Sequence, residues 1–442
     1  MIATVAAPLM EKFVIEGGAA LSGTVVPAGN KNGALPILAA CVLTEDEVVL
    51  RNVPRITDVE TMVAILEGLG VQATWLGENE LALDARDVGP DAALERRLAA
   101  RIRASFLLAG PLLARSGRAV MPAPGGDVIG RRRLDPHLDA FRALGAVVTA
   151  GRDVELRAPS GLRACDVFMD EPSVMGTENV LLAAARTPGT TVIGNAACEP
   201  HVQDLARMLQ KMGADIQGIG SNVLTVAGRT DLHGCEHTIG PDHIEIGSFM
   251  ALAGVTGGEL RIKDVIADDL RMIRLVFDRL GLRSELDGDD VLVPGGQRLV
   301  VARDVGEHKI KVQDGPWPAF PADLTSIAVA LATQSAGSAL IHEWMFENRM
   351  IFTDKLVLMG ADITLCDPHR AIVTGPSRLR GERVESPDIR AGMAMLIAAL
   401  CAEGSSEIGN IGQIDRGYER IDERLRELGA RIERVATEPL AV

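Results

Sequence analysis

Apolar residues along the chain recur in two kinds of helical segment that alternate. The first kind is rich in small residues and apolar on nearly every face, which is typical of a buried helix. It occurs six times, at residues 32–43, 102–114, 177–185, 246–254, 324–334 and 389–400. The second kind is amphipathic and ends in a Leu-Gly or Met-Gly pair, with the glycine at Gly70, Gly145, Gly213, Gly281, Gly360 and Gly429. Glycine at this point predicts that the helix stops in a left-handed conformation.

Strand patterns follow the first five of these glycines. Apolar and polar residues alternate over two short runs with a turn between them, most clearly in 71–83, 214–226 and 361–373. Successive glycines are 75, 68, 68, 79 and 69 residues apart. Such a regular period indicates an internal repeat. The sequence therefore predicts an α/β fold of six repeated α/β units, three per domain.

The sixth unit lacks one strand of this pattern. It runs out shortly after RIERV at 431–435, whereas the segment 13–27 has the pattern of two strands and precedes the first helix. We therefore expect the N-terminal strands to complete the last unit. This assigns residues 1–30 plus 240–442 to one domain and 31–239 to the other. The chain then crosses twice between the domains, and an interdomain cleft is a frequent place for a small-molecule site.

Composition narrows the possible partners. The 45 basic and 60 acidic residues give a net charge of -15, and only 13 residues are aromatic. An acidic surface with few aromatic rings is a poor match for nucleic acid. The longest nearly apolar stretches, 34–43 and 391–402, are shorter than the ~20 residues that span a bilayer. We expect a soluble, cytoplasmic protein without nucleic-acid or membrane partners; the sequence predicts no oligomeric state.

The sequence gives little support for a metal site or for a nucleoside triphosphate site. The six cysteines form no Cys-x-x-Cys pair, and the histidines lack the spacing of metal ligands. No Gly-Lys dipeptide occurs, which excludes the phosphate-binding loop of nucleoside triphosphatases. We expect free thiols and no bound metal.

Basic and acidic residues stand at equivalent places, just before helices. The backbone N–H groups of a helix N-terminus favour anions there. The residues concerned are Lys31, Asn32, Arg103, Asp127, Arg132, Asp135, Asp323, Arg349, Asp388, Arg390 and Arg416. If the six cations converge, they form a pocket suited to a carboxylate and phosphates. Asp127 lies in PAPGGDVIG, whose proline and glycines indicate a mobile loop.

These segments carry a specific resemblance. In order they read PAGNKNGALPILAA, RIRASFLLAGPLLAR, PGGDVIGRRRLDPHL, EPSVMGTENV, NAACEP, AFPADL, FENRM, DIRA and IDRGYERI. Together they resemble the UDP-N-acetylglucosamine enolpyruvyl transferases, from about residue 13 to residue 435. Sister enolpyruvylshikimate phosphate synthases have a Ser-Lys-Ser character in the first motif, where this chain has NKN. The resemblance implies a two-domain inside-out α/β barrel.

The resemblance also implies a reaction. The enolpyruvyl group of phosphoenolpyruvate is transferred to the 3-hydroxyl of UDP-N-acetylglucosamine with release of phosphate, the first committed step of peptidoglycan precursor synthesis. The resemblance implies that no metal or organic cofactor takes part. The chemistry needs an acid, a base and anion stabilisation. We expect Asp323 to be the base and Asp127 an acid or proton relay, with Lys31 and Arg416 in the electrostatic part of the catalytic set.

Substrate-binding roles follow from the same motifs. Lys31, Arg132 and Arg416 are expected at the phosphate of phosphoenolpyruvate, Arg349 and Arg390 at its carboxylate, and Arg103 in the same anion-binding set. The resemblance places the nucleotide sugar at a second group of residues, with Asp388 counted among the substrate-binding residues. The nucleotide-sugar group is Asn32, Asp323, Ser173, Val174 and the uridine strip Arg132, Arg133, Leu134, Asp135 and Pro136.

Several positions depart from the family pattern. Asp127 stands where many members have cysteine. Met175 replaces a glycine, Arg133 a proline, and His243 and Ile246 alter the motif PDRIETG. The last four changes lie toward the acceptor and leave its identity open. The alternatives are enolpyruvyl transfer to another uridine nucleotide of the UMP type, as in nucleoside-antibiotic pathways, or a catalytically silent binding paralogue.

Overall fold

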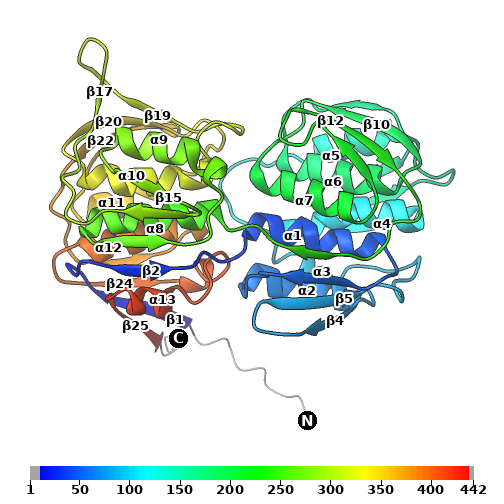
Figure 1. The fold of residues 1–442 in the computed structure, drawn as a ribbon, viewed down its shortest axis with the longest axis horizontal. Helices are drawn as coiled ribbons and strands as arrows, with labels where there is room; N and C mark the ends of the chain where they lie inside the picture. Colours follow the sequence, from blue (N-terminus) through cyan, green and yellow to red (C-terminus); the bar gives the residue numbers. More distant parts are fainter. Residues whose placement is uncertain (1–9, 438–442) are drawn as a thin grey trace.

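Each repeat forms a unit with one buried helix. The computed structural model describes residues 10–437. Every buried helix in it is followed by a strand and a second helix, and then by further strands in the first five units and by one strand in the sixth (Figure 1). The buried helices are α1 (Lys31–Ala40), α4 (Ala109–Ser116), α6 (Val174–Arg186), α8 (His243–Thr256), α10 (Thr325–Gln334) and α12 (Ile389–Cys401). Helices packed in the centre with sheets outside them confirm the predicted α/β architecture.

Polar side chains cap four of the buried helices. Asn30 accepts a hydrogen bond from the backbone of Gly33 at the start of α1, and Ser173 accepts one from Gly176 at the start of α6. Asp242 and Asp388 each accept two backbone N–H groups, at the starts of α8 and α12. These caps satisfy backbone donors that a helix end leaves free. Part of the polar pattern before the helices is therefore capping.

Three of the predicted buried helices are shorter than expected, and each adjoins a 3₁₀ turn. The helix expected over 32–43 ends at Ala40, where a 3₁₀ turn, Cys41–Leu43, follows α1. The segment 102–114 divides into a 3₁₀ turn, Arg103–Leu108, and α4. Pro111 fits this division, because its ring nitrogen cannot donate to the carbonyl of Leu107, although Pro36 lies inside α1 without dividing that helix. A third 3₁₀ turn, Ala322–Leu324, precedes α10 and holds Asp323.

The second set of helices covers the units. Its members are α2 (Thr57–Gly68), α5 (Asp135–Ala143), α7 (Pro200–Lys211), α9 (Arg271–Arg279), α11 (Thr353–Leu358) and α13 (Ile421–Glu427), and a short helix, α3, spans Arg96–Ala99. All six glycines that follow them have a positive φ, between +94° and +110°. The predicted helix stop is confirmed at each.

Six small sheets lie outside the buried helices. In the middle of the chain their orders are β13-β3-β5-β4, β6-β8-β7 and β11-β12-β10-β9. Their strands are β3 (Val48–Arg51), β4 (Gln72–Trp75), β5 (Glu80–Asp84), β6 (Arg118–Pro122), β7 (Val147–Ala150), β8 (Asp153–Arg157), β9 (Asp166–Phe168), β10 (Gly189–Gly194), β11 (Asp215–Gln217), β12 (Val223–Gly228) and β13 (Glu236–Thr238).

The other three sheets combine strands from the two ends of the chain. Their orders are β15-β16-β14-β2, β19-β20-β22-β21 and β23-β24-β1-β25, and β17-β18 forms a separate hairpin. Their strands are β1 (Met10–Glu16), β2 (Gly23–Val25), β14 (Leu260–Ile262), β15 (Glu285–Asp287), β16 (Asp290–Val293), β17 (Arg303–Asp304), β18 (His308–Lys309), β19 (Lys311–Gln313), β20 (Gly337–His342), β21 (Asp362–Asp367), β22 (Arg370–Gly375), β23 (Arg383–Glu385), β24 (Ser405–Gly409) and β25 (Arg431–Thr437).

The two N-terminal strands belong to different sheets. β1 lies between β24 and β25, antiparallel to both, and so supplies the strand that the sixth unit lacks. β2 instead pairs in parallel with β14 of the fourth unit. The expectation that both strands complete the last unit is therefore correct for β1 and wrong for β2.

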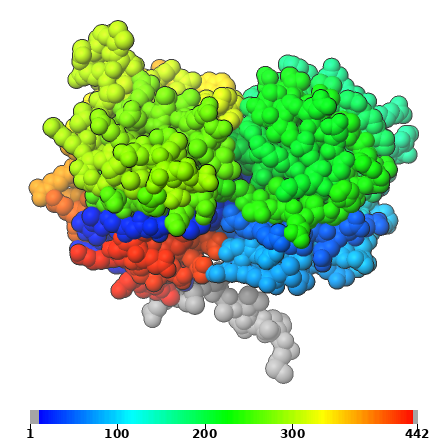
Figure 2. Space-filling model, in the orientation of Figure 1, coloured from blue at the N-terminus to red at the C-terminus, as the bar shows by residue number. Residues whose placement is uncertain are grey.

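Strand β2 leads directly to the first crossing between the two halves of the molecule. The chain passes from β2 to α1, and it returns from β13 to α8. The two crossing segments pair with each other: Asn30 N donates to Gly240 O over 2.8 Å, and Asp242 N donates to Ala28 O over 2.9 Å. Figure 2 shows the blue N-terminal segment continuing from one half onto the other.

Two apolar cores result from this path. One buries residues between 34 and 239, and we call this half the middle lobe. The other buries residues 13–25 together with 244–432, and we call it the terminal lobe. The exact domain boundaries near residues 30 and 240 stay a prediction. Within residues 10–437, no helix is long and apolar enough to cross a membrane.

Phe13 tests the role of β1 in the terminal lobe. Its ring is fully buried, and the Arg434 guanidinium lies 5.0 Å from the ring centroid. Phe13→Ala should lower the free energy of unfolding by about 3–5 kcal/mol. The control is Glu11→Ala on the same strand, which removes only an exposed ion pair and should cost at most ~1 kcal/mol. Urea unfolding measures both, and equal effects would show that β1 is not part of the core.

Candidate active site

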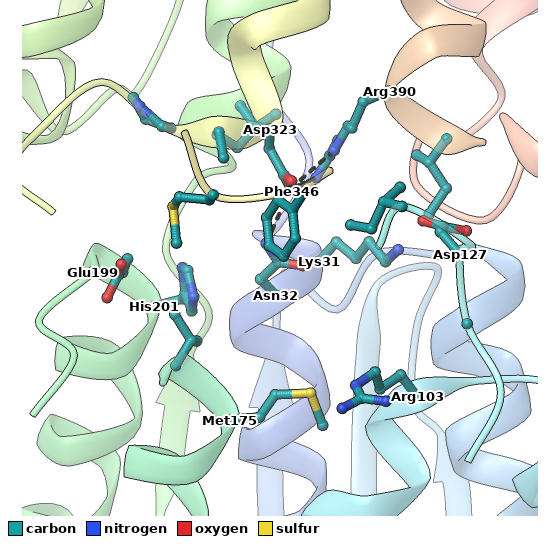
Figure 3. Close-up of a pocket in the computed structure, with 18 of the residues that line it drawn as sticks. Lys31, Asn32, Arg103, Asp127, Met175, Glu199, His201, Asp323, Phe346 and Arg390 are labelled. Carbon is teal, nitrogen blue, oxygen red and sulfur yellow. Dashed lines mark hydrogen bonds and ion pairs between the residues drawn. The ribbon is translucent and has the colours of Figure 1, made fainter. Parts of the chain in front are cut away.

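One cavity lies where the two lobes meet, and Figure 3 shows its lining. The middle lobe contributes the starts of α1, α6 and α7 and the loop around residue 127. The terminal lobe contributes the start of α8, the loops around residues 317–323 and 345–349, and the start of α12. Ten of the residues predicted from the sequence line this cavity: Lys31, Asn32, Arg103, Asp127, Arg132, Val174, Asp323, Arg349, Arg390 and Arg416.

A chain of ion pairs crosses between the lobes. Asp58 lies 2.9 Å from Lys31 Nζ and accepts a hydrogen bond of 2.8 Å from Arg416 Nε. Arg416 also binds Asp127 through its Nη1. Burial alone would raise the pKa of Asp58, but the charges of Lys31 and Arg416 lower it further than burial raises it. Arg416 of the terminal lobe is thus held by two carboxylates of the middle lobe.

Asp323 is the second carboxylate that binds two cations. Its Oδ1 accepts from Arg349 Nη2 over 3.0 Å, and its Oδ2 lies 3.0 Å from Arg390 Nη2. Asn32 approaches the same Oδ2 from the middle lobe, at 3.5 Å. Burial opposes ionisation of Asp323, yet Arg390, Arg349 and Lys31 together hold its pKa well below the usual range. Asp323 is therefore ionised, and its side chain is 26% exposed.

Arg103 and Arg132 differ from the other cations because they form no ion pair within residues 10–437. Arg103 Nη2 donates to the backbone oxygen of Arg132 over 2.6 Å. Burial, assisted by the charge of Arg132, lowers the pKa of Arg103 to about 10, and burial lowers that of Arg132 as well. Two partly buried cations side by side favour an anion between or beside them.

The opposite end of the cavity is polar and contains two neutral imidazole rings. The rings of His201 and His243 stack with centroids 6.2 Å apart, and Trp317 packs edgewise on His243. Burial lowers the pKa of His201 to about 3 and that of His243 to about 4, so both rings are neutral at pH 7. Burial raises the pKa of Glu178 and Glu199, which line the same end. This end suits uncharged hydrogen-bonding groups.

The comparisons with known proteins show the family to which the chain belongs. Residues 15–425 match the family model of EPSP synthase (3-phosphoshikimate 1-carboxyvinyltransferase). The chain belongs to this enolpyruvyl transferase family. The transferase is 56% identical to UDP-N-acetylglucosamine 1-carboxyvinyltransferase of Bradyrhizobium diazoefficiens, over 96% of this chain and 98% of the relative. It is 51% identical to the protein of the same name from Treponema denticola, over 96% and 99%.

Solved structures show the same fold for this transferase. The enolpyruvyl transferase NikO from Streptomyces tendae superposes with a TM-score of 0.87 at 26% identity, covering 98% of this chain and all of that one. An EPSP synthase from Acinetobacter baumannii gives 0.73 at 18% identity, covering 96% of this chain and all of that one, and supports the fold alone. The predicted architecture and enzyme class of the transferase are therefore confirmed.

Some predicted site residues of the transferase lie outside the cavity lining: Arg133, Leu134, Asp135, Pro136, Ser173 and Asp388. Ser173 and Asp388 are helix caps, as described above. Arg133 points to an acidic group outside the cavity and donates to Asp170 over 2.8 Å. Of the four departures noted toward the acceptor, Met175 and His243 line the cavity, whereas Ile246 is buried in α8.

Other lining residues of the transferase were not predicted from the sequence. Asp58 stands in the first turn of α2, where an acidic residue is common for capping reasons alone. Glu199 belongs to the motif NAACEP, which was noticed without a role for the carboxylate. Glu178, His201 and Trp317 offered no spacing that could have singled them out. Within residues 10–437, no three His, Cys, Asp or Glu side chains are grouped as a metal site requires.

Neighbouring arginines provide a test of the anion site. Inorganic phosphate should raise the melting temperature of the parent protein, because a ligand that binds only the folded state stabilises it. Arg132→Gln should weaken this phosphate binding about tenfold or more through loss of a charged hydrogen bond. Arg133→Gln, one residue away and outside the cavity, should leave it unchanged. If the two variants respond alike in a thermal-shift titration, Arg132 does not bind the anion.

Proposed function

We propose that this protein transfers the enolpyruvyl group of phosphoenolpyruvate to the 3-hydroxyl of UDP-N-acetylglucosamine and releases phosphate. The observation that carries the proposal is that one cavity brings together two unpaired guanidinium groups, Arg103 and Arg132, and an ionised carboxylate, Asp323. Relatives that are 45–56% identical over nearly the whole chain bear the name of this activity. This reaction is the first committed step of peptidoglycan precursor synthesis, and it takes place in the cytoplasm.

The cationic end of the cavity suits phosphoenolpyruvate. Arg103 and Arg132 have guanidinium N–H groups that can donate to phosphate oxygens. Lys31 and Arg416 line the same cavity. Arg349 and Arg390 already bind one carboxylate, that of Asp323, and planar guanidinium groups can bind a second through their remaining N–H groups. Among the described residues, Arg390 Nη1 and Arg349 Nε are buried without a hydrogen-bond partner, and Arg349 Nε lies 3.6 Å from the buried carboxylate of Glu343.

The chemistry proceeds in two stages. In the addition stage, the 3-hydroxyl oxygen bonds to C2 of phosphoenolpyruvate while its proton leaves to a base and another proton is added to C3. In the elimination stage, the bond from C2 to the phosphate oxygen breaks, and a proton leaves C3 to restore the double bond. Asp323 is positioned as the base for the hydroxyl, because it is ionised and faces the cavity.

Asp127 is the proposed carrier of the C3 proton. It comes from the middle-lobe loop and contacts Arg416 of the terminal lobe, so it reaches the reacting groups only while the lobes are together. A carboxyl group on a loop can deliver a proton and also respond to product release. Lys31 and Arg416 stabilise the anionic phosphate as it leaves.

A second acceptor remains a specific candidate. Met175 and His243, which depart from the family pattern, both line the cavity, and the neutral ring of His243 stacks on His201. The second candidate function is enolpyruvyl transfer to another uridine nucleotide of the UMP type.

Offering the acceptors separately decides between these functions. Phosphate release from phosphoenolpyruvate is measured with UDP-N-acetylglucosamine, UDP-glucose or UMP. We expect turnover with UDP-N-acetylglucosamine and little with the others. Turnover with UMP alone would establish the second candidate. No turnover with any acceptor would contradict both and favour a binding paralogue.

Asp323→Asn tests the base. The amide keeps the shape of the carboxylate but cannot take the hydroxyl proton, so kcat should fall about 10²- to 10⁴-fold while nucleotide-sugar binding persists. Asp58→Asn is the matched control, because it also removes a carboxylate from two cations, Lys31 and Arg416. It should alter mainly the KM for phosphoenolpyruvate. Equal losses of kcat would mean that charge balance, not proton transfer, explains the effect of Asp323→Asn.

A further inference from the structure

The loop that carries Asp127 is attached to the other lobe a few residues beyond it. We call residues 123–131 of the middle lobe the Asp127 loop and residues 344–349 of the terminal lobe the docking loop. Arg131 N donates to Glu347 Oε2 over 3.1 Å, and Asn348 N donates to Ile129 O over 3.0 Å. These two hydrogen bonds enclose Gly130 and join the lobes three residues from Asp127.

Gly130 shows how closely the two loops approach. Its φ is +139°, and a Cβ at this position would lie 2.1 Å from Glu347 Oε2 and 3.0 Å from Glu347 N. A residue with a side chain would clash with both groups, and its backbone would be strained. The carboxylate of Glu347 therefore lies directly against the backbone of the Asp127 loop.

The orientation of the Asp127 loop explains why it needs an attachment. Asp127 and Ile129 line the cavity, whereas the intervening Val128 is 88% exposed. The loop is thus a single layer with the cavity on one side and solvent on the other. Such a layer has little apolar contact to hold it in place.

The docking loop has a fixed conformation of its own. The buried carboxylate of Glu343 accepts hydrogen bonds from Met345 N over 3.2 Å and Phe346 N over 3.1 Å, and Asp314 accepts from Trp344 N. The same loop ends in Arg349, which binds Asp323. A rigid segment therefore contacts the Asp127 loop through one residue and Asp323 through another.

We propose that Glu347 is a positioning residue that holds the Asp127 loop over the cavity by accepting the backbone hydrogen bond of Arg131. It acts through the loop and does not itself line the cavity. The side chain is exposed at the junction of the lobes, so its replacement leaves both cores intact. The proposal rests on the proposed function only for the kinetic part of its test.

The acceptor oxygen, not the charge, is what this role requires. Glu347→Ala removes the oxygen and should lower kcat about tenfold, with the KM for the nucleotide sugar nearly unchanged. Glu347→Gln keeps an amide oxygen at the same place and should recover kcat to within about threefold of the parent. Glu285→Ala, an exposed glutamate on β15 remote from the junction, is the control and should behave as the parent.

Limited trypsin digestion measures directly how accessible the Asp127 loop is, because Arg131 is an exposed cleavage site within it. With phosphoenolpyruvate and UDP-N-acetylglucosamine present, cleavage after residues 131–133 should be at least fivefold faster in Glu347→Ala than in the parent or Glu347→Gln, at equal melting temperature. Parent-like protection and kcat in Glu347→Ala, or equal defects in the two Glu347 variants, would overturn the proposal. If the parent shows no turnover, the proposed function fails, while faster cleavage of unliganded Glu347→Ala still supports the docking role.

Discussion

Repulsion between like charges is the constraint that the site between the lobes has to satisfy. Two unit charges 4 Å apart repel by about 4 kcal/mol at an effective dielectric constant of ~20, and six cations line this cavity. Asp58 and Asp323 meet the constraint by binding two cations each. Of these six cations, only Arg103 and Arg132 form no ion pair with another residue of the described range 10–437, so the affinity for an anion is concentrated where those two lie.

The path of the chain explains how these groups come to face each other. At both crossings an edge strand stays in one lobe while the helix that follows it enters the other. The helices concerned, α1 and α8, are capped by Asn30 and Asp242, and the caps lie in the paired crossing segments. Asn30 also contacts His243 across the junction, 3.1 Å from its Nδ1. The two crossing segments thus fix two helix N-termini at the cavity. They are also the two places where the backbone passes from one lobe to the other.

Regular features of this fold could be predicted from the sequence, because they follow from local rules. The glycine stops, the buried helices and the missing strand of the sixth unit are all visible as patterns over a few dozen residues. The pairing of β2 with a different sheet from β1 could not be predicted, because its partner β14 lies more than 200 residues away in the sequence. A strand of three residues is also too short for its apolar pattern to specify a partner strand. Pro111 alone could not have revealed the 3₁₀ turn before α4, because Pro36 also lacks an N–H and yet lies inside the continuous helix α1.

The site could be predicted only as far as residue type and position before a helix indicate function. That criterion found Lys31 and Arg390 inside the cavity, but it also selected Asp388 and Ser173, whose side chains cap helices instead. It overlooked Asp58 and His201, because their importance depends on neighbours that are distant in sequence. Whether a polar residue caps, pairs or faces a ligand is decided by tertiary packing, which no local pattern contains.

The position of Asp323 links substrate binding to base strength. In the arrangement seen here, Arg390 and Arg349 hold its pKa far below the usual range, which makes the carboxylate a weak base. If the carboxylate of phosphoenolpyruvate binds the same two guanidinium groups, it shares their positive charge and adds a negative charge beside Asp323. Both effects raise the pKa of Asp323 and so make it a stronger base. In the proposed mechanism, the arginines therefore do more than bind the substrate. In the empty cavity they hold Asp323 ionised and weakly basic, and the anionic co-substrate is the group whose binding raises the basicity of Asp323 toward that needed to remove a hydroxyl proton.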